Sequence, residues 1–499
     1  MNRCAAGQGW GSPCARAAVA ALCMLVAMSC GGLSKLPSQG GPHWVEVKSE
    51  SFVLYTDLSA ERAREVSAKA EDLFWGLLHA GWPTEGVIHM KLNLVVLASR
   101  TDFEHFGGLE RGGYYIPNAL FEPMVVMPAP NMDDGFRVLA HELTHYISRQ
   151  SLQNQPTWLS EGLAEYYETA YRDSDGRFAV GSVSRNQIQW LSYKGLMPTR
   201  RLMDPLARPL DSVNFYPTAW LLVHYLMSRH AEEFAEYQKA LGSGLSHLPA
   251  WEQAFGHLDH AALDRALFNY GSRGVFDMFL LTVPKSDKAG EVHAMAAADV
   301  SALRGLLHAT CPRCEAADRA RWARADVEDA LRLKPHHLRA VATRLMYING
   351  GWEGASPDEA QLLSEQYPNQ WLSWFLLAQA QVTQDEDTGS ARNAIARALT
   401  LAPHQPYVLA LAAVLEAKSG KKSKALEYLE RIAELQPSEL ELVQARVALL
   451  SVIGECDKAR SAFEQMSNLA HGHMPESKWK VFREIVASCS TTQGAPPSD

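Results

Sequence analysis

The sequence predicts an α+β domain followed by an all-α domain of helical repeats. Segments with the two-residue alternation of β-strands occur only in the first third of the chain, and a 34-residue recurrence appears in the last third. The 499 residues are too many for one hydrophobic core. We therefore expect an α+β domain over residues 44–282 and a repeat domain over residues 291–490, separated by a linker at Val283–Gly290.

The first domain begins with a strand, helix, strand pattern. Apolar residues at helical spacing predict a helix that includes Val66–Leu77. The alternation in the third strand predicts one buried and one solvent-facing side, and Pro123 in the last suits an edge strand. The strands are expected at Trp44–Lys48, Phe52–Tyr55, Ile88–Leu97, Gly112–Tyr115 and Leu120–Met127.

Helices are predicted after these strands. Apolar residues from Phe136 to Ile147 recur on one helical face, and Asp133 and Asp134 precede it, where carboxylates favour a helix N-terminus. The later helices are expected at Trp158–Tyr171, Thr218–His230 and on to about Phe279.

The last third of the chain repeats with a fixed period. Pro403 and Pro437 are 34 residues apart, and so are Gly420 and Gly454. Small residues follow the same step at Ala391, Ala425 and Ala459. Because this is the tetratricopeptide period, the segment resembles a tetratricopeptide solenoid of about four repeats. Its concave groove would hold a protein partner or shape access to a site elsewhere in the chain.

The first thirty residues have the pattern of an export signal. Arg3 and Arg16 precede an apolar run, Ala17–Met28, which is too short to span a bilayer and has the length of a secretory hydrophobic region. The end of the run resembles a bacterial lipoprotein cleavage box, with Cys30 as the lipid-bearing residue, although ordinary cleavage before Cys30 also fits. We expect residues 1–30 to be a signal peptide, residues 31–43 a tether, and the protein to lie in the bacterial cell envelope, anchored to a membrane through Cys30.

Net charge and cysteine content indicate whether a nucleic-acid partner and disulfide bonds are expected. The net charge is −9 and there is no dense Lys/Arg block, so no nucleic-acid partner is expected. The even number of cysteines left in an exported chain suggests two disulfides, and Cys311 with Cys314 is better explained as a structural pair than as a redox motif. Cys456 and Cys489 are the remaining two, and the sequence does not establish their pairing.

One pentapeptide carries the chemistry. In His141-Glu-Leu-Thr-His145 the histidines are one helical turn apart, so both imidazoles can bind one zinc ion. Glu142 lies beside them as a general base. A hydrolytic zinc site needs a third ligand, which we predict to be Glu161 on a second helix, with Glu165 one turn further on to orient a ligand histidine.

These motifs resemble those of the gluzincins, the thermolysin-like and aminopeptidase-like metallopeptidases, over residues 44–280. The resemblance implies an α+β zincin-like fold, one Zn²⁺ per chain bound by His141, His145 and Glu161, and a protein or peptide substrate. An aminopeptidase would need an acidic group to hold the substrate's amine, and since we identify none in the sequence, we expect an endopeptidase. It also implies oxyanion stabilisation by Tyr216 and pairing of substrate with Gly112–Tyr115.

Simpler explanations stay open at this stage. The histidines could be solvated, Glu165 a surface residue and Tyr216 a packed aromatic. The whole chain could also act as an envelope assembly factor through its repeats, with a slow or vestigial metal site.

Overall fold

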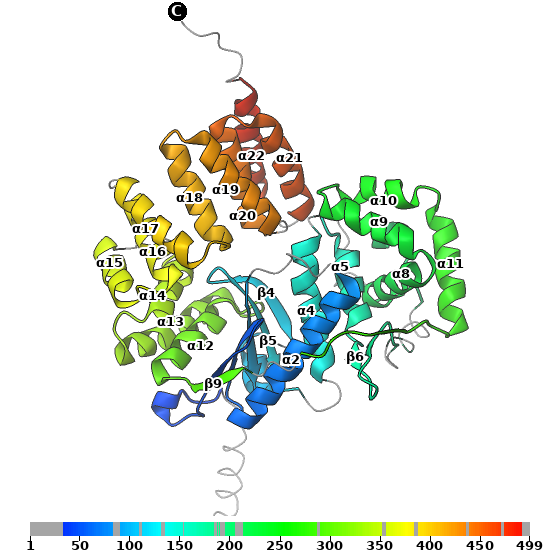
Figure 1. Ribbon diagram of the computed structural model, residues 1–499, viewed down its shortest axis with the longest axis horizontal. Coiled ribbons are helices and arrows are strands. Elements are labelled where there is room, and N and C mark those ends of the chain that lie inside the picture. Colours follow the sequence, from blue (N-terminus) through cyan, green and yellow to red (C-terminus); the bar gives the residue numbers. More distant parts are fainter. Residues whose placement is uncertain are drawn as a thin grey trace, which may run out of the picture.

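The computed structural model describes residues 33–491 except 83–89, 109–111, 131–134, 153, 184–186, 188, 190–194, 205–212, 287–289, 352–355, 384–387, 436–438 and 471–473. The chain is mostly helical, with a mixed sheet built largely from its N-terminal part. The sheet lies in the middle of the molecule, with α4, α5 and α8–α11 to one side and the repeat helices to the other (Figure 1). Cys30, Asp133 and Asp134 lie outside the described residues.

The main sheet has six strands in the order β4-β5-β3-β2-β1-β9. β2, β3 and β5 run parallel, and the other neighbouring pairs are antiparallel. The strands are β1 (Val45–Lys48), β2 (Phe52–Thr56), β3 (Leu92–Leu97), β4 (Tyr114–Ala119), β5 (Glu122–Pro128) and β9 (Glu291–Ala294).

Both faces of this sheet are buried, so the prediction of one solvent-facing side for the third strand is wrong. Leu94 and Val96 of β3 belong to the core shared with the helices of the first part, whereas Val95 and Leu97 belong to the core shared with the repeat helices. The alternation was real, but the second face is covered by a part of the chain some 200 residues further on. The two predicted domains therefore share one sheet.

Pro123 lies in an interior strand, because β5 is placed between β4 and β3, and the edge prediction is wrong. Its missing N–H is tolerated because pairing with β3 begins only at Met124. On the other side, the register of β4 shifts between Ile116 and Ala119, opposite the proline.

The helices of the first part match the predicted ones apart from their ends. The helix predicted at Trp158–Tyr171 ends at Tyr167, since Tyr171 starts a short strand of a second, three-stranded sheet β6-β7-β8. The helices expected on to about Phe279 end at Arg273, and Phe279 starts the third strand of that sheet. The elements are α2 (Ala60–Gly81), α3 (Arg100–His105), α4 (Gly135–Ser151), α5 (Thr157–Tyr167), β6 (Tyr171–Arg172), β7 (Phe178–Val180), α7 (Thr199–Leu202), α8 (Phe215–Arg229), α9 (Ala231–Gly242), α10 (His247–Phe255), α11 (His260–Arg273) and β8 (Phe279–Leu281).

The second part is a stack of helices. Among the described residues, four packed pairs are α12 with α13, α16 with α17, α18 with α19, and α20 with α21, where about four repeats were predicted. Helix α14 packs against α12 and α13, α15 packs against α16, and α22 is the last helix. The alanines predicted at the helix contacts, Ala391, Ala425 and Ala459, are fully buried. The helices are α12 (Ala297–Ala309), α13 (Ala316–Leu333), α14 (Leu338–Thr343) with the adjoining π-helical turn η3 (Arg344–Ile348), α15 (Pro357–Gln366), α16 (Trp371–Thr383), α17 (Thr388–Leu401), α18 (Pro406–Lys418), α19 (Lys422–Leu435), α20 (Leu440–Ile453), α21 (Cys456–Leu469) and α22 (Glu476–Thr491).

The segment predicted as a tether is packed against the body where the structure describes it, and the predicted linker contacts the body at Val283, whose carbonyl accepts a hydrogen bond from Arg172. Ser34 donates its backbone N–H to Asp102 and accepts a hydrogen bond from Arg304 of α12, at 2.9 and 2.6 Å. Beyond the predicted linker, β9 pairs with β1 and completes the main sheet. The strand Glu291–Ala294 is largely exposed and lacks apolar alternation, so its residues carry no strand signal.

The tip of the β4–β5 hairpin has an unusual backbone. Leu120 and Phe121 form its two-residue turn with φ of 51° and 71°, in the left-handed region that bulky residues rarely adopt. Such a conformation persists only where the surroundings impose it. Both side chains are buried among the repeat helices, which are those surroundings.

The hairpin occupies the inner surface of the repeats, which we call the repeat groove and which is formed by α14, α16, α18 and α20. The ring of Phe121 lies 4.9 Å from the rings of Phe375 and Tyr407, measured between centroids. Gln405 donates its amide N–H to the Phe121 carbonyl at 3.0 Å, and Asn118 donates to the Tyr407 hydroxyl. The groove that we expected to hold a protein partner therefore holds this part of the chain itself.

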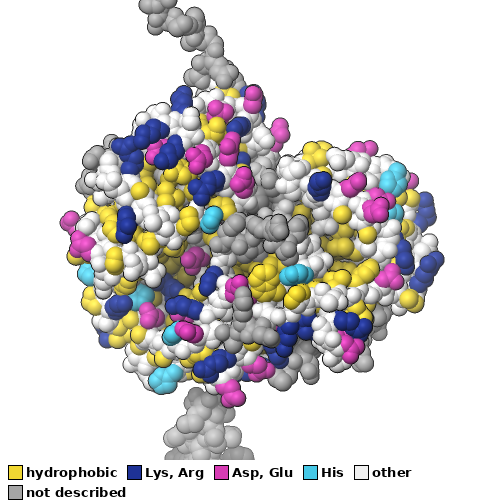
Figure 2. Space-filling model, in the orientation of Figure 1, with side chains coloured by type: hydrophobic (Ala, Val, Ile, Leu, Met, Phe, Trp, Pro, Cys, Tyr) yellow, Lys and Arg dark blue, Asp and Glu magenta, His cyan; other side chains and the backbone are white. Residues whose placement is uncertain are grey.

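Two disulfides join Cys311 to Cys314 and Cys456 to Cys489. The second ties the start of α21 to α22, which settles a pairing that the sequence left open. Among the described residues, no helix is both long and apolar enough to cross a membrane. On the face shown in Figure 2, basic and acidic side chains are interspersed, as the absence of a basic block in the sequence predicted.

Candidate metal centre

The helix α4 positions the two histidines by burying the opposite face. Leu139, Leu143 and Ile147 are fully buried against the sheet side of the core. His141 and His145 lie on the other face, and their side chains are 18% and 14% exposed. The predicted apolar face is therefore confirmed, and it turns the histidines towards α5.

Helix α5 brings Glu161 to these histidines because α5 can approach α8 closely. A Cβ atom at Gly162 would lie 2.6 Å from the carbonyl oxygen of Ala219 and 2.7 Å from a methyl group of Val223, so only glycine fits between the helices. Glu161 is the preceding residue and points the other way, towards α4. The glycine beside the glutamate is thus a packing requirement.

The three predicted ligand residues converge on one point. The Nε2 atoms of His141 and His145 are 3.2 Å apart. The Glu161 Oε2 atom lies 3.8 Å from the first and 3.7 Å from the second. One ligand atom from each residue lies within 4.8 Å of the other two, as a shared metal ion requires.

The Nδ1 atoms of both imidazoles lie near polar side chains of α5 and of Glu168, the residue that follows α5. His145 Nδ1 lies 3.1 Å from the Ser160 hydroxyl, and His141 Nδ1 lies 3.7 Å from Glu168 Oε2. A proton on each Nδ1 leaves each Nε2 with a lone pair directed at Glu161. Two neutral nitrogens and a carboxylate form the donor set of a hydrolytic zinc site, so the residues fit the ion that the sequence predicted.

The acidic surroundings also favour a cation here. Burial opposes a charge on His141, but the hydrogen bond to Glu168 and the charges of Glu142, Glu165 and Glu161 outweigh burial and raise the pKa of His141 to about 10. In a metal-free centre the cation is therefore a proton on His141. A metal ion competes with that proton for the same nitrogen.

Glu168, which the sequence interpretation missed, is the carboxylate closest to the outer nitrogen of His141. It also forms an ion pair with Arg137, and the hydrogen bonds from His141 and Arg137 hold the pKa of Glu168 below its usual value although burial acts to raise it. Glu161, Glu165 and Glu168 are spaced four and three residues apart, so they share one face of the α5 segment. That spacing was the available signal.

Glu165, predicted to orient a ligand histidine, lies near His141 but has other partners. His141, Glu165 and Glu168 bring ligand atoms within 4.8 Å of one another. Glu165 accepts a weak hydrogen bond from Gln187 at 3.4 Å. Burial and then the charge of Glu168 raise the pKa of Glu165 to about 7. The orienting role of Glu165 stays a prediction.

The two remaining predicted site residues lie on elements that border the ligands. Glu142 follows His141 on α4, is buried at 8% exposure, and its charge helps to raise the pKa of His141. Tyr216 is half-buried at the start of α8, one turn before Ala219, which contacts Gly162. The predicted roles of base and oxyanion donor require a substrate and stay predictions.

Strand β4, the predicted substrate strand, is an edge of the main sheet and begins beside α4. A Cβ at Gly113 would lie 2.8 Å from Val138, one turn before His141. The two glycines before β4 therefore allow the edge strand to start close to the ligand helix. The strand itself begins at Tyr114, two residues later than the predicted segment.

Comparison with known proteins adds a family match over this region. A family model described as "Protein of unknown function (DUF1570)" matches residues 138–244, which include α4 from Val138, α5 and α8. The match contains all three predicted ligands but less than half of the chain. No curated protein matches the chain.

Solved structures of helical proteins match parts of the chain, each with a low TM-score. A thermophilic tetratricopeptide-repeat protein of Thermus thermophilus is 18% identical, with a TM-score of 0.31 over 39% of this chain and 99% of its own. The MamA protein is 16% identical, with a TM-score of 0.26 over 37% and 94%. Yeast Tom70 is 12% identical, with a TM-score of 0.28 over 72% and 73%. Because these scores are low, the repeat architecture rests on the helix pairs themselves.

Proposed function

We propose that this protein is a zinc-dependent peptidase, with a zincin-like site in its first part, that cleaves protein or peptide substrates in the bacterial cell envelope. The observation that carries the proposal is the convergence of His141 Nε2, His145 Nε2 and Glu161 Oε2 on one point, with Glu142 adjacent. Zinc bound there would polarise a carbonyl group and lower the pKa of a water molecule.

The chain's own residues supply the remaining chemistry. The Glu142 carboxylate accepts a proton from the attacking water and delivers it to the amide nitrogen that leaves. Glu168 lies 3.7 Å from His141 Nδ1, where its carboxylate orients the ring and favours the tautomer that presents Nε2 to the metal. The edge strand β4 starts one turn from His141 and offers backbone groups to an extended peptide, which favours an endopeptidase.

The repeat part holds β4 in this proposal. The repeat groove binds the tip of the β4–β5 hairpin, so it fixes the strand that would pair with substrate. This contact argues against recruitment of a peptide partner at the same place in the groove. A scaffold function with a vestigial metal site is the alternative, and it requires a surface of the repeats outside the hairpin contact.

Zinc content and peptidase activity of three variants test the proposal. Glu142→Gln should keep about one zinc per chain and lose activity by roughly 10²- to 10⁴-fold, because only the proton transfer is removed. Glu161→Ala should lose the zinc, and Glu104→Ala, at an exposed glutamate of α3, should keep both zinc and activity. A folded wild-type protein that binds no zinc would contradict the proposal. Full activity of Glu142→Gln would show that Glu142 is not the general base.

A further inference from the structure

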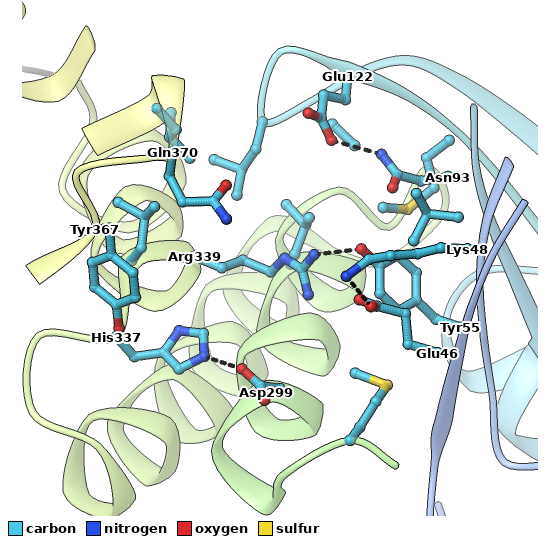
Figure 3. A pocket seen from close by; sticks show the side chains of 18 of the residues that line it. Glu46, Lys48, Tyr55, Asn93, Glu122, Asp299, His337, Arg339, Tyr367 and Gln370 are labelled. Carbon is cyan, nitrogen blue, oxygen red and sulfur yellow. Dashed lines mark hydrogen bonds and ion pairs between the residues drawn. The ribbon is translucent and has the colours of Figure 1, made fainter. Parts of the chain in front are cut away.

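A cavity of about 490 Å³ lies between the sheet and the repeats (Figure 3), and no residue of the metal centre lines it. Its walls come from β1, β2, β3, β5 and β9 on one side and from α12, α14 and the start of α16 on the other. A cavity of this volume accommodates a ligand of about the size of a dipeptide.

The guanidinium of Arg339 lies at the centre of this cavity (Figure 3). It donates to the Tyr55 hydroxyl at 2.8 Å, and its central carbon lies 5.0 Å from the centroid of the same ring. Arginine has five N–H donors, and no carboxylate of the described residues lies within 4.0 Å of this one. Most of the planar donor fork therefore faces the cavity with no charged partner from the described chain.

The acidic residues of the cavity already have partners. Glu46 pairs with Lys48 at 2.5 Å, and Asp299 pairs with His337 at 2.8 Å. The third, Glu122, accepts a hydrogen bond from Asn93 at 2.9 Å. None of these three carboxylates forms an ion pair with Arg339, so its donor fork stays available to a ligand, although Glu122 and Asp299 attract the guanidinium at longer range.

The 34-residue repeat period relates the position of Arg339 to residues that bind the hairpin in later repeats. Arg339 and Tyr407 are 68 residues apart, which is two periods of 34, and Glu441 lies one further period on. Tyr407 and Glu441 both accept hydrogen bonds from Asn118 of the hairpin, the second at 3.1 Å. Equivalent positions thus bind the hairpin in later repeats, whereas in the earlier repeat the same position faces the cavity. The cavity is the end of the repeat groove that the hairpin does not fill.

We propose that this end of the groove binds the carboxylate of a small organic ligand, such as the C-terminus of a short peptide, through the fork of Arg339. A carboxylate matches two parallel N–H donors of a guanidinium. The three nearby carboxylates repel a dianion more strongly than a monoanion, which favours a carboxylate over a phosphate. Trp371 and Leu120 supply an apolar wall for the rest of the ligand.

Binding of three probes to the full chain, measured by calorimetry, tests this site. N-acetyl-dialanine should bind, and its C-terminal amide and inorganic phosphate should each bind at least about tenfold more weakly, a difference of about 1.4 kcal/mol. Arg339→Met should weaken the carboxylate probe at least about tenfold. Arg321→Met is the matched control, because Arg321 lies on α13, is 67% exposed and does not line the cavity, so this variant should retain binding.

If Arg339→Met does not fold, the same binding measurements are made on Arg339→Lys. It keeps the charge but not the fork, and should still lose most of the preference for carboxylate over amide. The site is overturned if the folded wild type binds no probe, if phosphate binds as tightly as the carboxylate, or if the folded arginine variants bind like wild type. Glu142→Gln should leave probe binding unchanged, so this outcome is independent of the peptidase proposal.

Discussion

In both the repeat groove and the metal centre, polar side chains from successive helices converge on a buried point. The two regions differ in what partners these polar groups. In the groove the hairpin supplies the complement, since Asn118 donates to Tyr407 and the Phe121 carbonyl accepts from Gln405. In the metal centre the converging atoms are acceptors, two imidazole nitrogens and the Glu161 carboxylate. The part of the groove that the hairpin occupies is therefore complete within the chain, whereas we propose that a cation completes the metal centre.

The strongest test of the groove is removal of its central aromatic ring. Phe121→Ala should lower the free energy of unfolding by about 3–5 kcal/mol, because the buried ring contacts three aromatic side chains of the repeats and leaves a cavity. Denaturant unfolding measures this change. Val452→Ala is the control, at a side chain that is 72% exposed. A loss below about 1 kcal/mol would mean that the hairpin is not held by the groove.

The metal centre should respond to pH through His141. The pKa of His141 is raised to about 10 from an ordinary 6.5, so His141 carries a proton at neutral pH when no metal is bound. Since that proton must leave, apparent zinc affinity should rise about tenfold per pH unit, or about a hundredfold from pH 6.5 to 8.5. Competition with a chelator at each pH measures this rise.

The stability of the metal-free protein should change in the opposite direction. Because the pKa of His141 is higher in the folded state than in the unfolded state, its contribution to stability is fully present below pH 6.5 and is lost as the pH rises towards 10.

An apparent zinc affinity that stays flat between pH 6.5 and 8.5 would contradict the acidic environment deduced for His141.

The sequence predicted the local features of both regions better than their relation to each other. The apolar face of α4 and the buried alanines of the repeats follow from helical periodicity, which acts over a few residues. The burial of the second face of β3 and the interior place of Pro123 depend on segments distant in sequence, so the pattern around them carried no signal. The exposed strand β9 was missed because a strand without apolar alternation looks like a loop.

In the candidate site, too, local features were predicted from the sequence, whereas features that depend on packing were not. The spacing of His141 and His145 fixes one helical face, and the structure brings Glu161 to that face as predicted. Helical spacing alone could not separate Glu165 from Glu168, because both lie on the face that contains Glu161. The difference comes from packing, which puts Glu168 next to His141 Nδ1 and Arg137.

The smallest effect that we predict distinguishes these two glutamates. Glu168→Gln keeps the side chain's size but removes the charge that orients His141, so zinc affinity should fall by about 10- to 100-fold. Glu165→Gln is the matched variant on the same helical face, and we expect a smaller loss because Glu165 lies further from the ring and also accepts from Gln187.

Zinc affinity measured for both variants against the same chelator at pH 7.5 decides between them. If Glu165→Gln weakened zinc more than Glu168→Gln, the original prediction from sequence would be right and the contact at 3.7 Å would not be the one that orients the ligand. Equal losses would mean that the two carboxylates act as one acidic cluster. In that case the centre would depend on the total charge around His141 and not on a particular hydrogen bond.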